Sequence, residues 1–278
     1  MGMGNFITQG RWGAKSLIAL YVSVLSGLVL ALQYEPATPY FSASAIEVLI
    51  PFGAFWRSCH FYSSQLFFLS LLLHLFAIIL QRFDTGFTPG KWLLLLGTLP
   101  LSLLLLFSGY VLRADATGEA AGMIAENITL SMPLLGEGLN SLFFAIEAEG
   151  MKRVYANHLI GFGLFWGICA WEHLRRYRVS LRAHTLWLAA MLLFSLLVAA
   201  PMEPARLGVF HIQGPWFFLG LQELLRYLPA LWAGVLYPSL LLMALVAVAW
   251  PAWRRKALLF AALWLGSYLL LSLVGALR

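Results

Sequence analysis

Charged residues are scarce in this sequence. Only 11% of the 278 residues are Asp, Glu, Lys or Arg, whereas 61% are hydrophobic, and the mean hydropathy is +0.83. This composition excludes a water-soluble domain of this length and indicates a polytopic membrane protein. The sequence also lacks low-complexity tracts and any stretch polar enough to form a separate soluble domain.

Cysteine is scarce as well. Cys59 and Cys169 are far apart in the sequence, which contains neither a CxxC nor a CxxCH motif. Their spacing gives no support for a disulfide framework, a cysteine-based zinc site or covalent c-type haem attachment. The net charge of +6 would suit nucleic acid binding in a soluble protein, but the distribution of the charges argues against nucleic acid as a partner.

Apolar stretches long enough to cross a membrane recur along the chain. A bilayer core of ~30 Å needs about 20 apolar residues per helix. The stretches cover residues 16–34, 57–80, 92–112, 155–174, 185–200, 230–250 and 257–276. The first is not expected to be a signal peptide, because no small-residue cleavage site follows it. We therefore predict an all-α polytopic membrane protein with about seven transmembrane helices.

The loops differ in charge from one side of the membrane to the other. If the helices alternate in direction, 11 of the 18 Lys and Arg residues fall on one side, and ten of the 12 acidic residues fall on the other. The positive-inside rule then predicts an inside N-terminus and an outside C-terminus. We interpret the basic loops as orientation signals, with acidic phospholipid binding by Arg175 and Arg176 as an open alternative. The two long loops, 113–154 and 201–229, lie outside, where we expect the function.

Four of the six histidines lie in the apolar stretches as two pairs with similar spacing. His60 and His74 are 14 residues apart, and His158 and His173 are 15 apart. At ~100° and ~1.5 Å per residue, the members of each pair share roughly one helix face and lie about 21 Å apart along the axis. Both helices run inward, so His60 should face His158 near the outside and His74 should face His173 deeper in the membrane.

Two facing imidazoles suit haem better than zinc. Zinc needs three or four ligands, whereas haem iron takes two axial ligands and already has four porphyrin nitrogens. The apolar porphyrin also suits a helix bundle. We therefore predict two non-covalent b-type haems, the outer one on His60 and His158 and the inner one on His74 and His173.

Arginine and glycine residues near the histidines fit this interpretation. Arg57 and Arg153 precede the two outer ligands and would pair with haem propionates, although such arginines also snorkel to the interface. Gly13 and Gly27, 14 residues apart, would let a porphyrin edge approach the first helix, or would serve helix packing.

Three segments resemble a known family. RSCHFYSSQLFFLSLLLH (57–74), GYVL (109–112) and RVYANHLIGFGLFWGICAWEH (153–173) are similar to the cytochrome b of quinol–cytochrome c reductase complexes, in its shorter, b6-like branch. GPWFFLGLQELLRYLP (214–229) resembles the companion subunit IV, fused here into one chain. The resemblance implies a b6-like four-helix dihaem bundle over residues 1–180 and a three-helix domain with an outer quinol-site loop over residues 181–278.

The resemblance also implies a function. The chain would be a subunit of a respiratory or photosynthetic complex, in a bacterial cytoplasmic membrane, that oxidises quinol only within that complex. Quinone would be the substrate, and the partners would be an iron–sulfur (Rieske-type) protein and c-type cytochrome subunits, in a dimer. Gly13, Gly27 and Gly109 would line the haem edges, and Arg57 and Arg153 would lie beside the outer propionates. The outer haem would have the low potential and the inner haem the high potential.

The outer quinol site departs from the family pattern. Arg113-Ala114-Asp115 replaces Pro-Trp-Gly, and Gly214-Pro215-Trp216-Phe217 replaces Pro-Glu-Trp-Tyr, so the acidic residue of that motif is missing. Glu223 is a substitute proton acceptor or an ordinary interfacial carboxylate. Glu203, His211 and Asp115 are further candidates, and His184 is expected to be interfacial.

These departures leave other hypotheses open. One is a non-bifurcating, quinone-linked cytochrome that exchanges electrons with multihaem c-type subunits. Another is a membrane anchor that only scaffolds a complex, against which four buried histidines argue. Two-haem membrane anchors of dehydrogenases are the nearest enzymatic rival, but they usually have four or five helices and lack the GYVL and PWFFLGLQELL segments.

Overall fold

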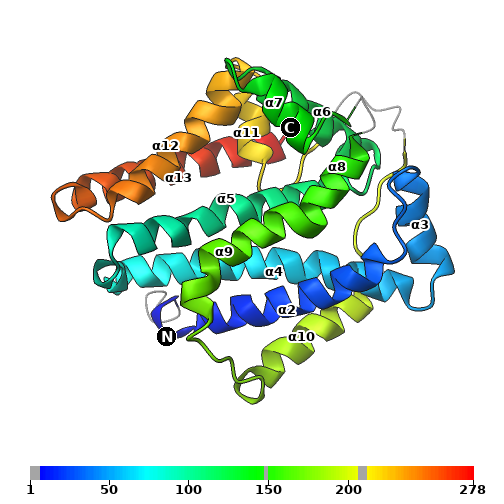
Figure 1. Ribbon diagram of the computed structural model, residues 1–278, viewed down its shortest axis with the longest axis horizontal. Coiled ribbons are helices and arrows are strands. Elements are labelled where there is room, and N and C mark those ends of the chain that lie inside the picture. Colours follow the sequence, from blue (N-terminus) through cyan, green and yellow to red (C-terminus); the bar gives the residue numbers. More distant parts are fainter. Residues whose placement is uncertain (1–6, 147–149, 206–211) are drawn as a thin grey trace.

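The computed structural model describes residues 7–146, 150–205 and 212–278. Within these ranges the regular structure is entirely helical, which confirms the predicted all-α class. Four long helical runs lie side by side in the centre of the molecule (Figure 1). They are α2 (Trp12–Ala31), α4 (Gly53–Leu80), α5 (Pro89–Val111) and the run of α8 (Met151–Ala156), η3 (Asn157–Gly161) and α9 (Phe162–Leu174). Helix α2 packs against α4, and α5 packs against α9.

Shorter helices cover one end of this bundle, which we call the outer end because its loops are acidic (Figure 1). They are α3 (Pro39–Leu49), α6 (Ala116–Leu130) and α7 (Gly136–Phe143). Pro39 favours the start of α3, because proline fits the first turn of a helix. Asp115 caps α6 by accepting a hydrogen bond from the Gly118 N–H. Within its described residues, the long outer loop 113–154 is therefore largely helical.

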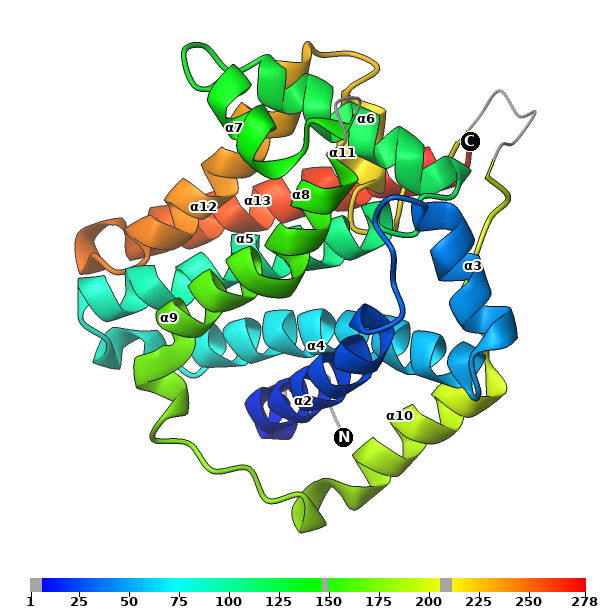
Figure 2. The same cartoon turned by 45° about the vertical axis from the view of Figure 1, so that its right-hand side comes forward.

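The C-terminal helices lie on two opposite sides of the central bundle. Helix α10 (Thr185–Leu197) packs against α4 and α2, whereas α12 (Tyr237–Ala247) packs against α5 and α13 (Pro251–Ala276). Figures 1 and 2 show the bundle between them. The short helix α11 (Leu219–Leu224) packs on α13, and the π-helical turn η5 (Leu231–Leu236) precedes α12. The division at residue 180 stays a prediction, but the three predicted helices after it are not gathered on one side of the bundle.

Four helices of the described residues are long and apolar enough to cross a membrane, namely α2, α4, α5 and α13. The other three predicted spans are helical but shorter or interrupted, in α8–η3–α9, α10 and η5–α12. The number of seven spans therefore stays a prediction. Large apolar side chains project outward from α13, with Leu263 75% exposed and Leu269 68% exposed. Such a surface suits lipid rather than water.

Candidate functional site

The structure brings together the two predicted pairs of histidines. The ring centroids of His60 on α4 and His158 in η3 are 6.1 Å apart. The centroids of His74 on α4 and His173 on α9 are 6.3 Å apart. Since α4 is continuous from Gly53 to Leu80, its two histidines lie about 21 Å apart along the axis. The site is thus two pairs of imidazoles at two depths between the same two helical runs.

A π-helical turn explains why the two histidine spacings differ by one residue. His158 lies in η3 (Asn157–Gly161), where the backbone hydrogen bonds close wider turns than in an α-helix. A wide turn takes up one extra residue, so the 15 positions from His158 to His173 advance about as far around the helix as 14 regular positions do. Both helical runs can therefore present their imidazoles in the same register.

Hydrogen bonds fix the orientation of the outer imidazoles. The Nδ1 of His60 lies 2.8 Å from the Ser23 carbonyl oxygen, which can only accept, so Nδ1 is the donor. The Ser108 hydroxyl donates to the Leu104 carbonyl at 2.7 Å and therefore accepts from His158 Nδ1 at 2.9 Å. In both rings the lone pair is thus on Nε2, the atom that must face a metal ion.

Three glycines lie directly against the imidazoles. A Cβ atom added to Gly27 would meet His60 Cε1 at 2.8 Å, and one added to Gly109 would meet His158 Cε1 at 3.0 Å. A Cβ atom added to Gly13 would meet His74 Cε1 at 3.0 Å. Glycine at these three positions lets the helices approach the rings as closely as they do.

These residues fit a haem. Two imidazole nitrogens on one metal ion, each at about 2 Å, would hold the ring centroids roughly 6 Å apart. Among the described residues no group of three or more His, Cys, Asp and Glu side chains is placed to hold a metal ion, so a zinc site lacks ligands. A cavity of about 520 Å³ adjoins the inner pair, with Gly13, Leu17 and Phe67 among its largely apolar walls. Two ligands, a glycine cradle and apolar walls are what a b-type haem requires.

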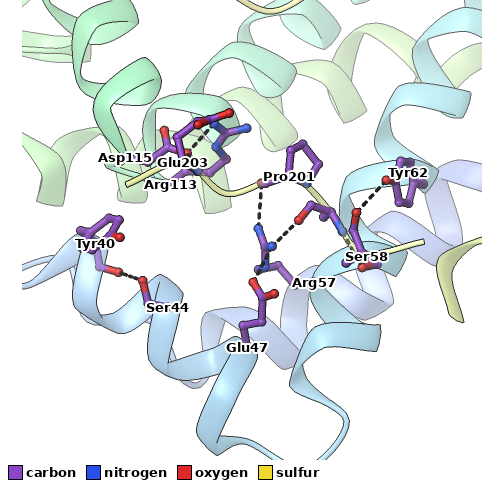
Figure 3. A network of polar contacts seen from close by, with 12 residues as sticks. Tyr40, Ser44, Glu47, Arg57, Ser58, Tyr62, Arg113, Asp115, Pro201 and Glu203 are labelled. Atoms are coloured by element: carbon purple, nitrogen blue, oxygen red, sulfur yellow. Dashed lines mark hydrogen bonds and ion pairs between the residues drawn. The ribbon is translucent and has the colours of Figure 1, made fainter. Parts of the chain in front are cut away.

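At the outer end, Arg57 is held by protein groups (Figure 3). Its guanidinium forms an ion pair with Glu47 of α3 and donates to the Ala200 and Pro201 carbonyls. We call residues 199–204 the strap, because this segment leads from α10 across the bundle end. The Ser58 hydroxyl and the Tyr62 hydroxyl also bind the strap, at 2.9 Å and 3.0 Å.

The predicted propionate arginines therefore differ in their surroundings. Arg57 is largely buried within the network just described, whereas Arg153 is exposed beside the buried Val154. Their contact with haem propionates stays a prediction. The pairing of Arg57 with Glu47 was not predicted, because the two residues belong to different helices whose packing the sequence pattern does not specify.

Asp115 binds the other end of the strap. Its carboxylate is fully buried and accepts hydrogen bonds from the Thr117 hydroxyl, the Gly118 N–H and the Glu203 N–H. Figure 3 shows Asp115 beside Arg113 and Glu203. Arg113 forms an ion pair with the same carboxylate at 2.5 Å. The departure Arg113-Ala114-Asp115 thus has a structural role as a helix cap and an anchor. Among the other proton-acceptor candidates, Glu203 is exposed and His211 lies outside the described residues.

Two tyrosines tie the outer end of α2 to its neighbours. Tyr34 donates to the Leu112 carbonyl at 2.7 Å, and Tyr155 donates to the Ala31 carbonyl at 2.8 Å. These two hydrogen bonds join segments that are 78 and 124 residues apart in the sequence.

Glu223 lies on α11, buried against α13. Its carboxylate is 2% exposed, accepts a hydrogen bond from the Tyr227 hydroxyl at 3.0 Å, and forms ion pairs with Arg278 at 3.0 Å and Arg226 at 3.4 Å. The proton-acceptor role of Glu223 stays a prediction. His184, expected at the interface, is buried at the start of α10, with its Nδ1 3.0 Å from the Ser180 carbonyl oxygen.

The fold and the site together define a class: a helical membrane protein whose central bundle holds two stacked pairs of facing imidazoles. The family model for cytochrome b/b6/petB matches residues 6–176. The chain therefore belongs to the cytochrome b/b6 family, whose members are b-type cytochromes of membrane electron transfer.

Individual cytochromes b6 and b are similar to this chain in sequence. Cytochrome b6 of Heliobacterium mobile is 29% identical over 154 residues, which cover 53% of this chain and 72% of that protein. Cytochrome b of Chondrus crispus is 25% identical over 157 residues, which cover 54% of this chain and 41% of that protein. A solved structure of a hyperthermophilic respiratory Complex III has a chain with a TM-score of 0.69 and 18% identity, covering 96% of this chain and 91% of that one. That likeness shows that the fold is shared over nearly the whole chain.

Proposed function

We propose that this chain is the dihaem subunit of a membrane complex that moves electrons between quinol or quinone and partner redox subunits. The observation that carries the proposal is that two pairs of imidazoles face each other at two depths of one helical bundle. When bound, each haem iron would supply a reversible one-electron carrier within the membrane.

The chain's own residues would hold these groups at fixed positions. His60 and His158 would ligate the outer haem, and His74 and His173 would ligate the inner one. Ser23 and Ser108 support the outer assignment, because their hydrogen bonds set the tautomer of each ring. Arg57 and Arg153 would neutralise propionates at the outer end.

Haem content tests the proposal. We expect two haems per purified chain, and we expect His60→Ala and His158→Ala to lose the same haem in reduced-minus-oxidised spectra. His74→Ala and His173→Ala should lose the other haem. His184→Ala is the matched control, since His184 adjoins the inner cavity and bonds to a backbone carbonyl. The assignment is wrong if single changes in one pair remove different haems, or if His184→Ala removes one.

For the reaction, we propose quinol oxidation at the outer end, with Glu223 accepting a proton and an iron–sulfur protein or a c-type cytochrome accepting electrons. The outer end is supported by its acidic loops and by the buried Glu223 carboxylate. Residues 1–180 would form the haem-binding part and residues 181–278 the quinol-site part. The N-terminus would lie inside a bacterial cytoplasmic membrane, which reporter fusions at the two termini would test.

A second candidate is a subunit that exchanges electrons with multihaem c-type partners without bifurcation. It is favoured by the outer segment at residues 214–217, which lacks a carboxylate. In this segment the indole N–H of Trp216 donates a hydrogen bond to the Gln65 side chain at 2.8 Å. The two candidates differ in one measurement. If adding an oxidant drives quinol-dependent reduction of the inner haem, the reaction bifurcates and the second candidate fails.

A further inference from the structure

A second cavity lies at the other end of the molecule, which we call the inner end. It has a volume of about 540 Å³ and opens between the α4–α5 connection and the α12–α13 connection. These connections appear at the left of Figure 1. The lining of the cavity includes the charged residues Arg82, Asp84, Arg254 and Arg255 and the apolar residues Leu258 and Leu259. None of the four paired histidines lines it, and it shares only Phe87 with the lining of the cavity beside His74.

The charges around this cavity do not cancel. Asp84 and Arg254 form a two-point ion pair, at 3.0 Å and 3.1 Å, with both side chains largely buried. Arg82 and Arg255 are exposed, and among the described residues neither side chain is in an ion pair. The buried pair is neutral as a unit, so the cavity carries two further positive charges. A cavity of this kind attracts an anion.

The cavity lies at the level where lipid headgroups would surround the protein. It lies where three apolar helices end or begin, namely α4 at Leu80, α5 at Pro89 and α13 at Pro251. Trp250 and Trp253 are 47% and 59% exposed nearby, as in the aromatic belts at membrane surfaces. The site therefore faces the boundary between water and hydrocarbon, at whichever side of the membrane this end lies.

The walls of the cavity continue onto the lipid-facing surface of α13. Leu258 and Leu259 belong to the cavity, and Leu259 and Leu263 are 58% and 75% exposed. An acyl chain whose headgroup lay in the cavity could follow these leucines along the helix. A soluble anion would gain nothing from these walls, and an uncharged headgroup would gain nothing from Arg82 and Arg255.

We propose that this cavity binds one phospholipid with an anionic headgroup. Its phosphate would lie between Arg82 and Arg255, and its acyl chains would lie against α13. The lipid would join the α4–α5 connection to the α12–α13 connection, adding to the contact that Arg254 and Asp84 already make between them. This inference does not depend on the proposed redox function.

Native mass spectrometry of the purified, delipidated full chain in detergent tests the proposal. The probes are phosphatidylglycerol and phosphatidylcholine with the same acyl chains, and inorganic phosphate as a competitor. The test variant is Arg82→Gln/Arg255→Gln, which leaves the ion pair of Asp84 intact. The matched control is Lys91→Gln/Arg182→Gln, which removes the same charge from two exposed positions on the same side of the predicted topology that do not line the cavity.

We expect one phosphatidylglycerol to bind. The test variant should weaken that binding by about thirtyfold, since each basic residue near a membrane surface contributes a factor of about five to six. The control variant should bind as the unchanged chain does, and far-UV circular dichroism should confirm that both variants keep the helical fold. Equal weakening in the control would show general surface attraction only. Equal binding of phosphatidylcholine, displacement by inorganic phosphate, or an unaffected test variant would each overturn the proposal.

Discussion

Gly27→Ala tests whether glycine is required beneath the outer imidazoles. The added Cβ would lie 2.8 Å from His60 Cε1, whereas ordinary contact begins at 3.4 Å. The ring must therefore retreat from α2 by about 0.6 Å. Its hydrogen bond to the Ser23 carbonyl, now 2.8 Å, would stretch toward about 3.4 Å, beyond the usual range.

This displacement has an energy that can be estimated. Inserting a methyl group into a well-packed site costs typically about 1–3 kcal/mol. If that cost falls on the haem-bound state, affinity for the outer haem drops by about 5- to 150-fold. The inner haem should be unaffected, because the three atoms nearest to a Cβ at Gly27 all belong to His60 of the outer pair. Gly13→Ala, with its Cβ 3.0 Å from His74, should have the opposite selectivity.

Haem titration of the chain, followed by redox titration to separate the two haems, measures these affinities. Gly163→Ala is the control, because a Cβ at Gly163 has no neighbour within 4 Å. If Gly27→Ala binds the outer haem as tightly as the unchanged chain, glycine is not required beneath His60. The same conclusion follows if Gly163→Ala weakens the same haem by the same factor.

Three further predictions concern the outer and inner ends. Ala114 has a left-handed backbone (φ 51°), so Ala114→Gly should raise the free energy of unfolding by about 0.5–1 kcal/mol; a lower thermal midpoint in detergent would contradict this. Asp84→Ala should lower the free energy of unfolding by about 3 kcal/mol, because Arg254 would stay buried without its partner. Adding Arg254→Met should restore most of that loss, and a double variant as unstable as Asp84→Ala would contradict this. Glu223→Gln should slow quinol-driven haem reduction about a hundredfold if Glu223 accepts the proton. The unfolding midpoint of Glu223→Gln should change little, because the arginine partners of Glu223 are 42% and 46% exposed. An unchanged rate of quinol-driven haem reduction would leave Glu223 a structural role only.

The sequence predicts the helical class and the partners within each histidine pair, because both depend on regular periodicity. A 14-residue spacing on one long helix places His60 and His74 on nearly one face, and the structure agrees. The π-helical turn at His158 could not be predicted in the same way. Side-chain pattern reports which face is apolar, but not whether a backbone N–H bonds four or five residues back.

The arrangement of the C-terminal helices was also beyond the sequence. The apolar residues of α10, α12 and α13 show that these helices must be kept from water. Lipid and protein can do this equally well, so the pattern does not reveal which of the two lies against each helix. The side of the bundle on which α10 lies depends on the strap, which is fixed by groups far away in sequence, such as Arg57 and Asp115. Similarly, Ser23 and Ser108 are ordinary helix serines until the histidine rings are placed beside them.

The wide turn at residues 157–161 also has an evolutionary consequence. A one-residue insertion or deletion in a regular membrane helix rotates everything beyond it by about 100° and would separate ligands on one side of the change from those on the other. Where a wide turn can form or revert, the helix absorbs that change locally. Chains whose ligand spacings differ by one residue can therefore keep the same cofactor geometry, and this turn is the place where a single-residue deletion should be tolerated best.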